Sequence, residues 1–419
     1  MKEVDVVVIG AGFSGLTFAH YLPNKYRVLI LDRKSKLNSA IESTGLITEV
    51  TKNLFADFTD VEAFLPNHIT TISVVSPDYN KYFFSHTEKP WIYSTDTPEF
   101  LKHMSETLPD NVDLKLESSF VDYSIEPDHD YPVKIIYNQN GSGQKELRCK
   151  FIVGADGVNS KLAKVNSNLS TNKKLLVGYE KVFYGNINLG EHPESTVYHF
   201  WFGEFSLGYG GWLSPTIVNG KKAFRLGLAK LEKDKDKIHL LEKFINKLKD
   251  EKIIKIDEEH KNPIHTFAHS IPIGGVLPDL YDGNSILIGD AAGFCGAFAA
   301  DGIKGSIISG KVAARLIPKY LEGEKNILNS YLKEMNKFNH LISYYRRQQL
   351  YRALWNRMKS DRSFHALYNL IEKEKEGFLN QFCDNMTKKK GLTKVILKLK
   401  NIPALSWYAI SLFFDLFRK

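Results

Sequence analysis

The sequence predicts an α/β fold in which the strands of a parallel sheet are separated along the chain by an inserted antiparallel-sheet domain and followed by a C-terminal helical region. A β-rich run at 4–9 leads into a glycine-rich turn and a helical stretch, which together start a βαβ unit. Short apolar runs at 151–153 and 286–288 have the composition of further buried strands. From residue 327 onward the pattern is helical and amphipathic. The parallel strands therefore lie on both sides of the inserted sheet in the sequence.

The first turn has the spacing of a dinucleotide-binding loop. Gly10, Gly12 and Gly15 allow, in this order, a tight turn, a close approach of the backbone to a pyrophosphate, and close packing of the helix on the strand. The helix that starts near Phe13 would hold the pyrophosphate at its positive N-terminus. Asp32 follows the next apolar run about twenty residues on, where an acidic side chain accepts hydrogen bonds from ribose hydroxyls. We therefore expect the chain to bind an adenine dinucleotide.

Length and composition describe a globular protein of two or three lobes. The chain has 419 residues, of which 43% are hydrophobic and 25% charged, so it can bury a large core. Its three cysteines are widely spaced, and His265 and His269 lie in a strand-and-loop context, so we expect neither disulfides nor a metal site. The first strand starts so early that we expect no signal peptide, and no apolar run is long enough to span a bilayer. We therefore expect a cytoplasmic protein.

Two later turns extend the pattern. Asp156 and Gly157 follow one of the later apolar runs, and Gly289 and Asp290 follow the other. In this order and at these separations, the three turns resemble the FAD-dependent superfamily that contains para-hydroxybenzoate hydroxylase. The resemblance implies a Rossmann-like FAD-binding domain, in which Asp156 and Gly157 lie near the pyrophosphate and Asp290 binds the ribityl chain. The helix that starts near Gly302 would point its dipole at the flavin pyrimidine and stabilise negative charge there.

Two further segments indicate which family within this superfamily the chain resembles. Residues 289–314 resemble the geranylgeranyl reductase family, whose members saturate isoprenoid chains of archaeal lipids or of chlorophyll and quinone precursors. That family also carries a Tyr-x-Trp-x-Phe-Pro element on a strand over the substrate cavity, and Tyr209, Trp212 and Pro215 are similar to it. The resemblance covers residues 1–345 and implies that these three side chains bind a prenyl substrate.

The chain departs from the family pattern near the ring and the substrate. Thr44-Gly45 stands where the family has Cys-Gly in the loop that faces the flavin ring, so the thiol is missing. In the aromatic element the tyrosine comes one residue early, and Ser214 replaces phenylalanine. Ala297 and Ala300 replace an expected proline and glycine. These changes bear on the identity of the substrate more than on flavin binding.

These observations define an expected site and four segments. The residues expected to bind FAD are Gly10, Gly12, Phe13, Ser14, Gly15, Asp32, Arg33, Thr44, Gly45, Asp156, Gly157, Gly289, Asp290, Gly302 and Ile303. Substrate is expected at Tyr209, Trp212 and Pro215, and no catalytic side chain is assigned. We expect the FAD-binding domain at 1–170, with inserted strands at 68–95, and again at 276–325. The sheet-rich substrate domain is expected at 171–275, and the helical region with its basic amphipathic tail at 326–419.

The first hypothesis is an FAD-dependent reductase of a geranylgeranyl or similar isoprenoid lipid. Reduced FAD would give a hydride to one carbon of the alkene, and a proton must reach the other carbon. No acid stands out in the sequence as the proton donor, because Thr44 occupies the position of the family's cysteine. The sequence has a single dinucleotide motif, so the electrons would come from transiently bound NAD(P)H or from a ferredoxin.

Two other hypotheses stay open. A flavin monooxygenase or halogenase would use the same fold, and the turn around Asp156 is common in hydroxylases. Against it, Gly293 stands where hydroxylases usually have histidine, and Gly210 stands at the first tryptophan of the halogenase motif. The third hypothesis is a non-catalytic flavin-binding redox protein, and turnover in solution would separate it from an enzyme.

The end of the chain is both basic and apolar. The net charge is +8, and residues 388–419 contain eight Lys or Arg against one acid, Asp415. No nucleic-acid motif accompanies this charge, so we expect no nucleic-acid partner. Apolar residues alternate with the basic ones, and Trp407 and Tyr408 lie among them, which suits a membrane surface. We expect peripheral contact of 392–419 with the inner surface of the membrane.

Overall fold

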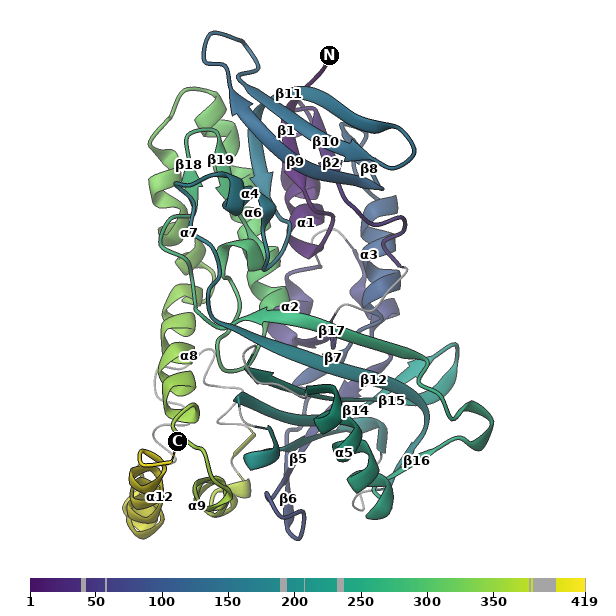
Figure 1. The fold of residues 1–419 in the computed structure, drawn as a ribbon, viewed down its shortest axis with the longest axis vertical. Helices are drawn as coiled ribbons and strands as arrows, with labels where there is room; N and C mark the ends of the chain where they lie inside the picture. Colours follow the sequence, from purple (N-terminus) through teal and green to yellow (C-terminus); the bar gives the residue numbers. More distant parts are fainter. Residues whose placement is uncertain are drawn as a thin grey trace.

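The computed structural model describes residues 1–38, 43–56, 59–188, 194–206, 208–231, 237–376, 378–379 and 397–418. The molecule is elongated, with one β-sheet at the end that carries the N-terminus and a second sheet at the opposite end (Figure 1). A column of helices runs along one side from the first sheet to the second, and the C-terminus lies at the end of the second sheet.

Among the described residues the first sheet has eight strands, and its centre is parallel. Its strands are β1 (Lys2–Ile9), β2 (Val28–Leu31), β8 (Val112–Lys115), β9 (Ser118–Ile125), β10 (Val133–Gln139), β11 (Gly143–Gly154), β18 (Tyr281–Asp282) and β19 (Ser285–Leu287). Every neighbouring pair in the order β19–β11–β1–β2–β8 is parallel, while β9 and β10 continue β11 as antiparallel strands. The apolar residues of β1 and of the end of β11 are buried on both faces, as in parallel sheets covered by helices. The carboxyl ends of β1, β11 and β19 therefore meet at one edge, where the three glycine turns follow them.

The second sheet is mostly antiparallel. Its described strands are β5 (Thr71–Val75), β6 (Tyr82–His86), β12 (Leu175–Ile187), β13 (Val197–Trp201), β14 (Gly208–Val218), β15 (Lys221–Leu231), β16 (Ile254–Ile256) and β17 (His265–Pro272). β5 pairs in parallel with β13, so the hairpin β5–β6 from within 1–170 extends a sheet that is otherwise built from 171–275. α5 (Lys237–Asp250) covers one face of this sheet through Phe244 and Leu248. The opposite face is left to line a cavity.

A small sheet and the remaining helices complete the fold. The small sheet consists of β3 (Leu46–Thr48), β4 (Asn67–Ile69) and β7 (Ile92–Ser94). The helices are α1 (Phe13–Tyr21), α2 (Glu49–Asn53), α3 (Thr97–Glu106), α4 (Lys161–Val165), α6 (Gly302–Leu321), α7 (Tyr331–Lys337), α8 (Leu341–Trp355), α9 (Asp361–Glu372) and α12 (Ile402–Asp415). None of the described helices combines the length and the apolar character that a membrane crossing requires.

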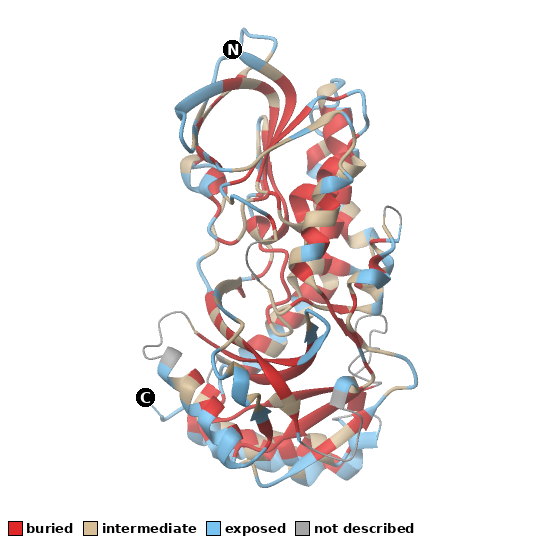
Figure 2. Cartoon of the chain, turned by 90° about the vertical axis from the view of Figure 1, so that its right-hand side faces the viewer, coloured by how far each residue is buried: buried red, intermediate tan, exposed pale blue. Residues whose placement is uncertain are grey.

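α1 and α6 cross closely beside the first sheet. A Cβ atom on Gly310 would lie 2.7 Å from the carbonyl oxygen of Ser14, so a larger residue would separate the two helices. Phe18 and Ile307 are fully buried in the same core, and each such burial stabilises the fold by about 2 kcal/mol. Buried residues run through the strands of both sheets and through these helices (Figure 2). The crossing brings the N-termini of α1 and α6 to the same cavity.

Candidate active site

A cavity of about 1110 Å³ lies between the carboxyl edge of the first sheet and the open face of the second sheet. At one end its wall consists of the turns after β1, β11 and β19. At the other end it is lined by aromatic and aliphatic side chains from the second sheet and from α8, α9 and α12. One continuous space therefore joins three polar turns to a long apolar chamber.

The three glycines of the first turn have different surroundings. A Cβ atom on Gly10, whose φ is +103°, would lie 2.4 Å from the carbonyl oxygen of Ala155. A Cβ atom on Gly15 would lie 2.0 Å from the carbonyl oxygen of Gly10, so this glycine allows α1 to pack on the strand. At Gly12, by contrast, a Cβ atom would meet nothing within 4 Å, because the residue faces the cavity. Gly10 and Gly15 thus shape the turn, and Gly12 keeps it open toward a ligand.

Asp32 and Arg33 differ in their environments. Asp32 is buried, and its two oxygens accept hydrogen bonds from the backbone N–H groups of Ala11 (2.7 Å) and Lys34 (2.8 Å). The carboxylate thereby ties the first turn to the end of β2, and its remaining lone pairs can accept from a ribose hydroxyl. Arg33 is exposed and lies outside the cavity wall, whereas Lys34 contributes to the wall. Lys34 is a residue that the sequence motifs did not point to.

Asp156 and Gly157 also have different roles: Asp156 supports the next helix, and Gly157 lines the cavity. Asp156 accepts hydrogen bonds from the backbone N–H groups of Lys161 (2.6 Å) and Leu162 (3.3 Å), so it holds the start of α4. Burial raises the pKa of its carboxyl. Gly157 lines the cavity with a φ of +77°, and a Cβ atom there would meet nothing within 4 Å. The backbone at Gly157 therefore leaves room for a ligand, as at Gly12.

The third turn brings a buried carboxyl to the cavity. Asp290 lines the cavity, and its Oδ1 has no hydrogen-bond partner among the residues that the structure describes. Burial raises the pKa of Asp290. Gly302 and Ile303, the first residues of α6, line the cavity beside it, and a Cβ atom on Gly302 would lie 2.9 Å from this Oδ1. A buried acceptor without a partner next to a helix N-terminus fits a ligand that carries hydroxyl groups.

The loop at Thr44 and Gly45 is held by a residue of the second sheet. The Arg225 guanidinium on β15 donates hydrogen bonds to the carbonyl oxygens of Thr44 (2.6 Å), Thr95 (3.2 Å) and Ser43 (3.4 Å). Gly45 has a φ of +66°, and its carbonyl oxygen accepts a hydrogen bond from the Thr95 hydroxyl (2.7 Å). This loop therefore lies at a fixed position in the cavity wall, between the glycine turns and the second sheet.

Trp212 is positioned by a row of residues across three strands. Trp212 on β14 pairs with Gly227 on β15, and Gly227 pairs with Glu180 on β12. A Cβ atom on Gly227 would lie 2.4 Å from the indole ring, so the glycine lets the ring cross the middle strand. The indole Nε1–H then donates a hydrogen bond of 2.7 Å to Oε2 of the fully buried Glu180. The ring is therefore fixed flat against the sheet, on the cavity side.

Tyr209 reaches the same face through a β-bulge. The pairing of β14 with β15 shifts between Gly208 and Gly210, so Tyr209 is an extra residue on its strand. In the sequence this tyrosine comes one residue earlier than in the aromatic element of the family that the chain resembles, and the extra residue of the bulge compensates for that. The ring centroids of Tyr209 and Trp212 lie 6.2 Å apart. Burial raises the pKa of Tyr209 to about 12. Pro215 lies three residues beyond Trp212, so the alternation of the strand turns it to the opposite face, away from the cavity.

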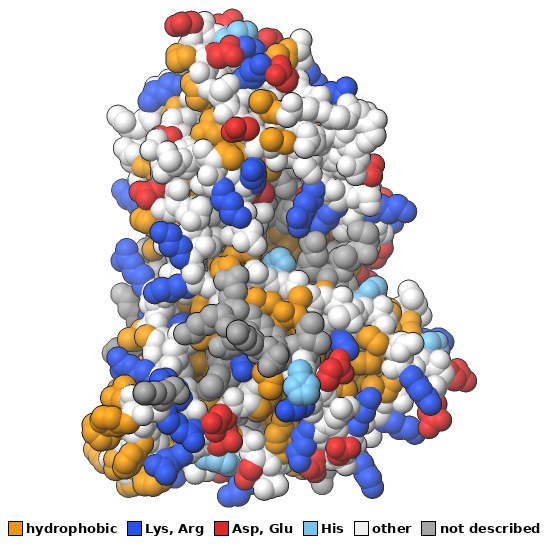
Figure 3. Space-filling model, in the orientation of Figure 1, with side chains coloured by type: hydrophobic (Ala, Val, Ile, Leu, Met, Phe, Trp, Pro, Cys, Tyr) orange, Lys and Arg blue, Asp and Glu red, His pale blue; other side chains and the backbone are white. Residues whose placement is uncertain are grey.

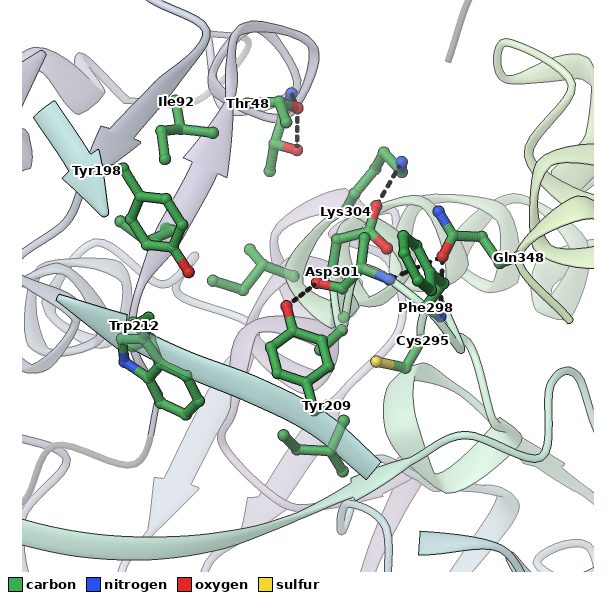
Figure 4. A pocket seen from close by; sticks show the side chains of 18 of the residues that line it. Thr48, Ile92, Tyr198, Tyr209, Trp212, Cys295, Phe298, Asp301, Lys304 and Gln348 are labelled. Atoms are coloured by element: carbon green, nitrogen blue, oxygen red, sulfur yellow. Dashed lines mark hydrogen bonds and ion pairs between the residues drawn. The ribbon is translucent and has the colours of Figure 1, made fainter. Parts of the chain in front are cut away.

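The wall opposite these aromatic rings is a clamped loop that precedes α6. Gln348 accepts hydrogen bonds through Oε1 from the backbone N–H groups of Phe298 (2.9 Å) and Ala299 (2.7 Å). Asp301 accepts hydrogen bonds from Lys304 and from the Tyr344 hydroxyl, both at 2.8 Å. Figure 4 shows Tyr209 and Trp212 on one side of the cavity and this loop, with the buried Cys295, on the other. The two walls meet where the Tyr209 hydroxyl donates a hydrogen bond of 3.4 Å to the carbonyl oxygen of Ala299.

The structure brings most of the predicted residues to the cavity. Those that line it are Gly12, Phe13, Ser14, Thr44, Gly45, Gly157, Asp290, Gly302, Ile303, Tyr209 and Trp212. Those that stand behind the wall are Gly10, Gly15, Asp32, Arg33, Asp156, Gly289 and Pro215.

Sequence reasoning missed Glu180 and Arg225, two buried charged residues behind the cavity. Arg225 interrupts the apolar run at 224–229. A lone charge in a buried strand requires a partner, so the sequence alone could have marked Arg225 as a residue with a structural role. Glu180 gave no such signal, because it lies in a strand where polar and apolar residues mix.

Known proteins share this sequence pattern and fold. Residues 3–342 match the family described as FAD binding domain. The chain is 24% identical over 422 residues to digeranylgeranylglycerophospholipid reductase 3 of Methanosphaera stadtmanae, which covers 95% of this chain and 96% of the relative. It is 26% identical over 402 residues to the digeranylgeranylglycerophospholipid reductase of Methanocaldococcus jannaschii, covering 93% of this chain and 96% of the relative. A geranylgeranyl bacteriochlorophyll reductase-like protein of Thermoplasma acidophilum has the same fold, with a TM-score of 0.75 and 18% identity over 96% of this chain and 100% of that one.

The family match runs from β1 to the start of α8, so it includes all three glycine turns. The open space before Gly12 and Gly157 and the unpartnered oxygen of Asp290 fit a dinucleotide that carries a polyhydroxyl chain. The chain therefore belongs to the FAD-binding domain family, and it is an FAD-dependent oxidoreductase similar to the geranylgeranyl reductases.

Proposed function

We propose that this oxidoreductase saturates carbon–carbon double bonds of a geranylgeranyl or similar isoprenoid lipid. The observation that carries the proposal is the apolar chamber, which continues without a break from the three turns to α9 and α12. A prenyl chain is long and apolar and has no hydrogen-bonding group, so a wall of aromatic and aliphatic side chains suits it. The names of the two archaeal relatives support the same class of substrate.

We propose that FAD binds in the polar part of the cavity. The turn at Gly12 and the backbone at Gly157 would hold its pyrophosphate, and Asp290 its ribityl chain. The loop at Thr44 would face the isoalloxazine ring, whose negative charge the N-terminus of α6 would stabilise. Bound there and reduced, FAD would supply a hydride. The electrons would reach it from a donor that binds transiently, NAD(P)H or a ferredoxin, since the sequence holds a single dinucleotide motif.

We further propose that α12 rests on a membrane and connects it to the chamber. Leu405 and Tyr408 of this helix line the cavity. Trp407, Phe413 and Phe414 of the same helix are exposed by 52%, 56% and 53% of their surface. Figure 3 shows apolar surface gathered over α12 at the lower left of the molecule. If the exposed aromatic residues of α12 lie in the lipid while its other face lines the chamber, a lipid chain has only a short path from the membrane to the cavity.

The charges near α12 contribute less to this proposal than the sequence suggests. Lys398 and Lys400 both pair with Glu374, at 2.7 and 2.8 Å, and Arg418 pairs with Glu204 at 3.1 Å. Ion pairs within the protein reduce the attraction of these residues to anionic lipid. Residues 392–396 and 419 of the predicted contact segment lie outside the described residues. The membrane proposal therefore rests on the exposed apolar surface.

The substrate proposal is tested with holoprotein whose flavin is reduced chemically without oxygen. A geranylgeranylated lipid is added, the oxidised-flavin absorbance is followed, and the lipid is analysed by mass spectrometry. We expect flavin oxidation and a lipid that gains hydrogen atoms in pairs, whereas the fully saturated lipid leaves the flavin reduced. Flavin that stays reduced with every prenyl lipid contradicts the proposal, and an oxygen adduct formed on admission of air would favour a monooxygenase.

The membrane proposal is tested by co-sedimentation with vesicles of zwitterionic and anionic lipids. The double variant Trp407→Ser, Phe414→Ser is expected to bind both kinds of vesicle at least about tenfold more weakly, because two exposed aromatic side chains are removed. Ile125→Ser removes an exposed apolar side chain from the first sheet and is the matched control. Equal binding of the double variant and the wild type would contradict contact through α12.

A further inference from the structure

Glu180 is a buried acid behind the part of the cavity wall that Trp212 forms, and the proposed reaction gives it no role beyond holding Trp212. We propose that Glu180 supplies the proton for the reduction and that the Thr44 hydroxyl carries it to the cavity. The inference rests on the proposed function, because a proton is needed only if an alkene is reduced. It fills the place of the donor that the sequence did not reveal.

The position of Glu180 suits this role. Glu180 is fully buried and does not line the cavity, whereas Thr44 lines it. The Thr44 side chain lies close enough to the Glu180 carboxyl to lower its pKa, and the Trp212 indole donates to that carboxyl a hydrogen bond of 2.7 Å. Oε1 of Glu180 has no hydrogen-bond partner that meets ordinary geometry among the described residues. Thr44 is therefore near the Glu180 carboxyl and also lines the cavity in which the alkene would lie.

Burial favours the protonated form of Glu180. Burial in the sheet raises its pKa, and the charge of Arg225 and the side chains of Trp212 and Thr44 reduce that rise without cancelling it. Arg225 directs three of its hydrogen bonds at the carbonyl oxygens of Ser43, Thr44 and Thr95. Tyr198 on β13 also senses the charge of Glu180, and burial raises the pKa of this tyrosine well above its usual value. A neutral acid with a cation nearby can lose a proton and then be stabilised as a carboxylate.

The proton transfer balances with the hydride transfer of the proposed reaction. The π bond of the alkene is replaced by two C–H bonds, of which one comes from the hydride of reduced FAD. For the other, the Thr44 hydroxyl gives its proton to the second carbon while it takes the proton of Glu180. Glu180 is left as a carboxylate beside the Arg225 guanidinium, and it regains a proton from solvent before the next turnover.

The experiment uses the holoprotein and its Glu180→Gln variant. Glutamine keeps an oxygen that accepts from the Trp212 indole, so the variant retains this hydrogen bond and, we expect, its flavin content. In the infrared spectrum at neutral pH, the wild type is expected to show the carbonyl band of a protonated buried carboxyl, which shifts in D2O and is missing from Glu180→Gln. In single turnovers with reduced flavin and prenyl lipid, Glu180→Gln is expected to react at least about 100-fold more slowly and to lose the pH dependence of the wild type.

Thr44 gives a matched pair of variants. Thr44→Val keeps the shape of the side chain and removes the hydroxyl, so we expect slow turnover with the Glu180 infrared band still present. Thr44→Ser keeps the hydroxyl and is expected to react faster than Thr44→Val. A merely structural role of Thr44 would rank the two variants the other way, since valine matches the size of threonine better.

The outcomes separate this inference from the proposed function. Wild-type holoprotein that reduces no prenyl lipid overturns both. Lipid reduction by the wild type without the infrared band, or with Glu180→Gln reacting at the wild-type rate, overturns only the role of Glu180. Lipid reduction that slows in Glu180→Gln and in Thr44→Val, with the band present in the wild type, supports the proton path.

Discussion

The two walls of the cavity are built on different principles. On the side of the first sheet the wall is backbone: Gly12 and Gly157 face the cavity without side chains, and Gly10 and Gly15 shape the turn behind them. On the side of the second sheet the wall is side chains: the buried Glu180 holds the Trp212 ring, and the buried Arg225 holds the neighbouring loop at Thr44. A wall made of backbone is disturbed by any side chain added to its glycines. A wall made of side chains is disturbed when the buried residues that hold those side chains are changed.

The strongest test of the backbone wall compares two of its glycines. Gly15→Val would place a side chain against the Gly10 carbonyl oxygen, which lies 2.0 Å from the position that the new Cβ atom would take. We expect a loss of more than about 4 kcal/mol of stability, seen as a lowered thermal midpoint or insoluble protein. Gly12→Val has open space at the same position, so we expect folded, colourless protein. A yellow Gly12→Val with one FAD per chain would contradict the placement of the pyrophosphate.

The next test removes Arg225, the residue of the second sheet that holds the loop at Thr44. Arg225→Met would leave the carbonyl oxygens of Thr44 and Thr95 without their donor in a buried place. The expected loss is about 3 kcal/mol in chemical unfolding, together with weaker FAD binding in a fluorescence titration. Lys222→Met removes an exposed charge from the same strand and should change stability by less than about 0.5 kcal/mol. Equal effects of the two variants would show that Arg225 does not hold the loop.

A smaller effect is expected from Glu180, and it depends on pH. Burial raises the folded-state pKa of Glu180 above that of the unfolded chain, so folding favours the protonated form. The stability from this group is present below the unfolded pKa and is lost as the pH rises through the folded pKa. Glu180→Gln lacks this loss, so its free energy of unfolding should rise relative to that of the wild type as the pH increases, by about 1.4 kcal/mol for each unit of pKa difference. The exposed Glu251→Gln should show no such trend in chemical unfolding, and a parallel pH profile for Glu180→Gln would contradict the protonated state.

The smallest effect is expected at the Tyr209 hydroxyl. Its hydrogen bond to the carbonyl oxygen of Ala299 is long, at 3.4 Å, so Tyr209→Phe should change stability by less than about 1 kcal/mol. Flavin content and the rate of lipid reduction should stay close to those of the wild type. A large drop in the single-turnover rate would instead assign proton transfer to this hydroxyl and weaken the case for Glu180.

The difference between the walls also explains which parts could be predicted from the sequence. The turn at Gly10, Gly12 and Gly15 works through backbone geometry, which a fixed spacing of glycines encodes locally. The pairing of Trp212 with Glu180 depends on the register of three strands and on the missing side chain of Gly227, and no local pattern encodes it. The parallel core and the helical C-terminal region were predicted correctly as a fold class. The strands β5 and β6 were expected as an insertion in 1–170, and their pairing with β13 is a long-range contact that only the folded chain reveals.

The bulge at Tyr209 has a consequence for recognising related enzymes. One additional residue on β14 changes the spacing between the tyrosine and the tryptophan along the chain, yet both rings still face the same chamber. On our proposal that these rings bind the substrate, what matters is their arrangement in space, and a single insertion leaves it intact because a local kink absorbs the extra residue. A search that demands a fixed interval between the two aromatic residues would pass over chains such as this one, and a search by the positions of their rings would find them.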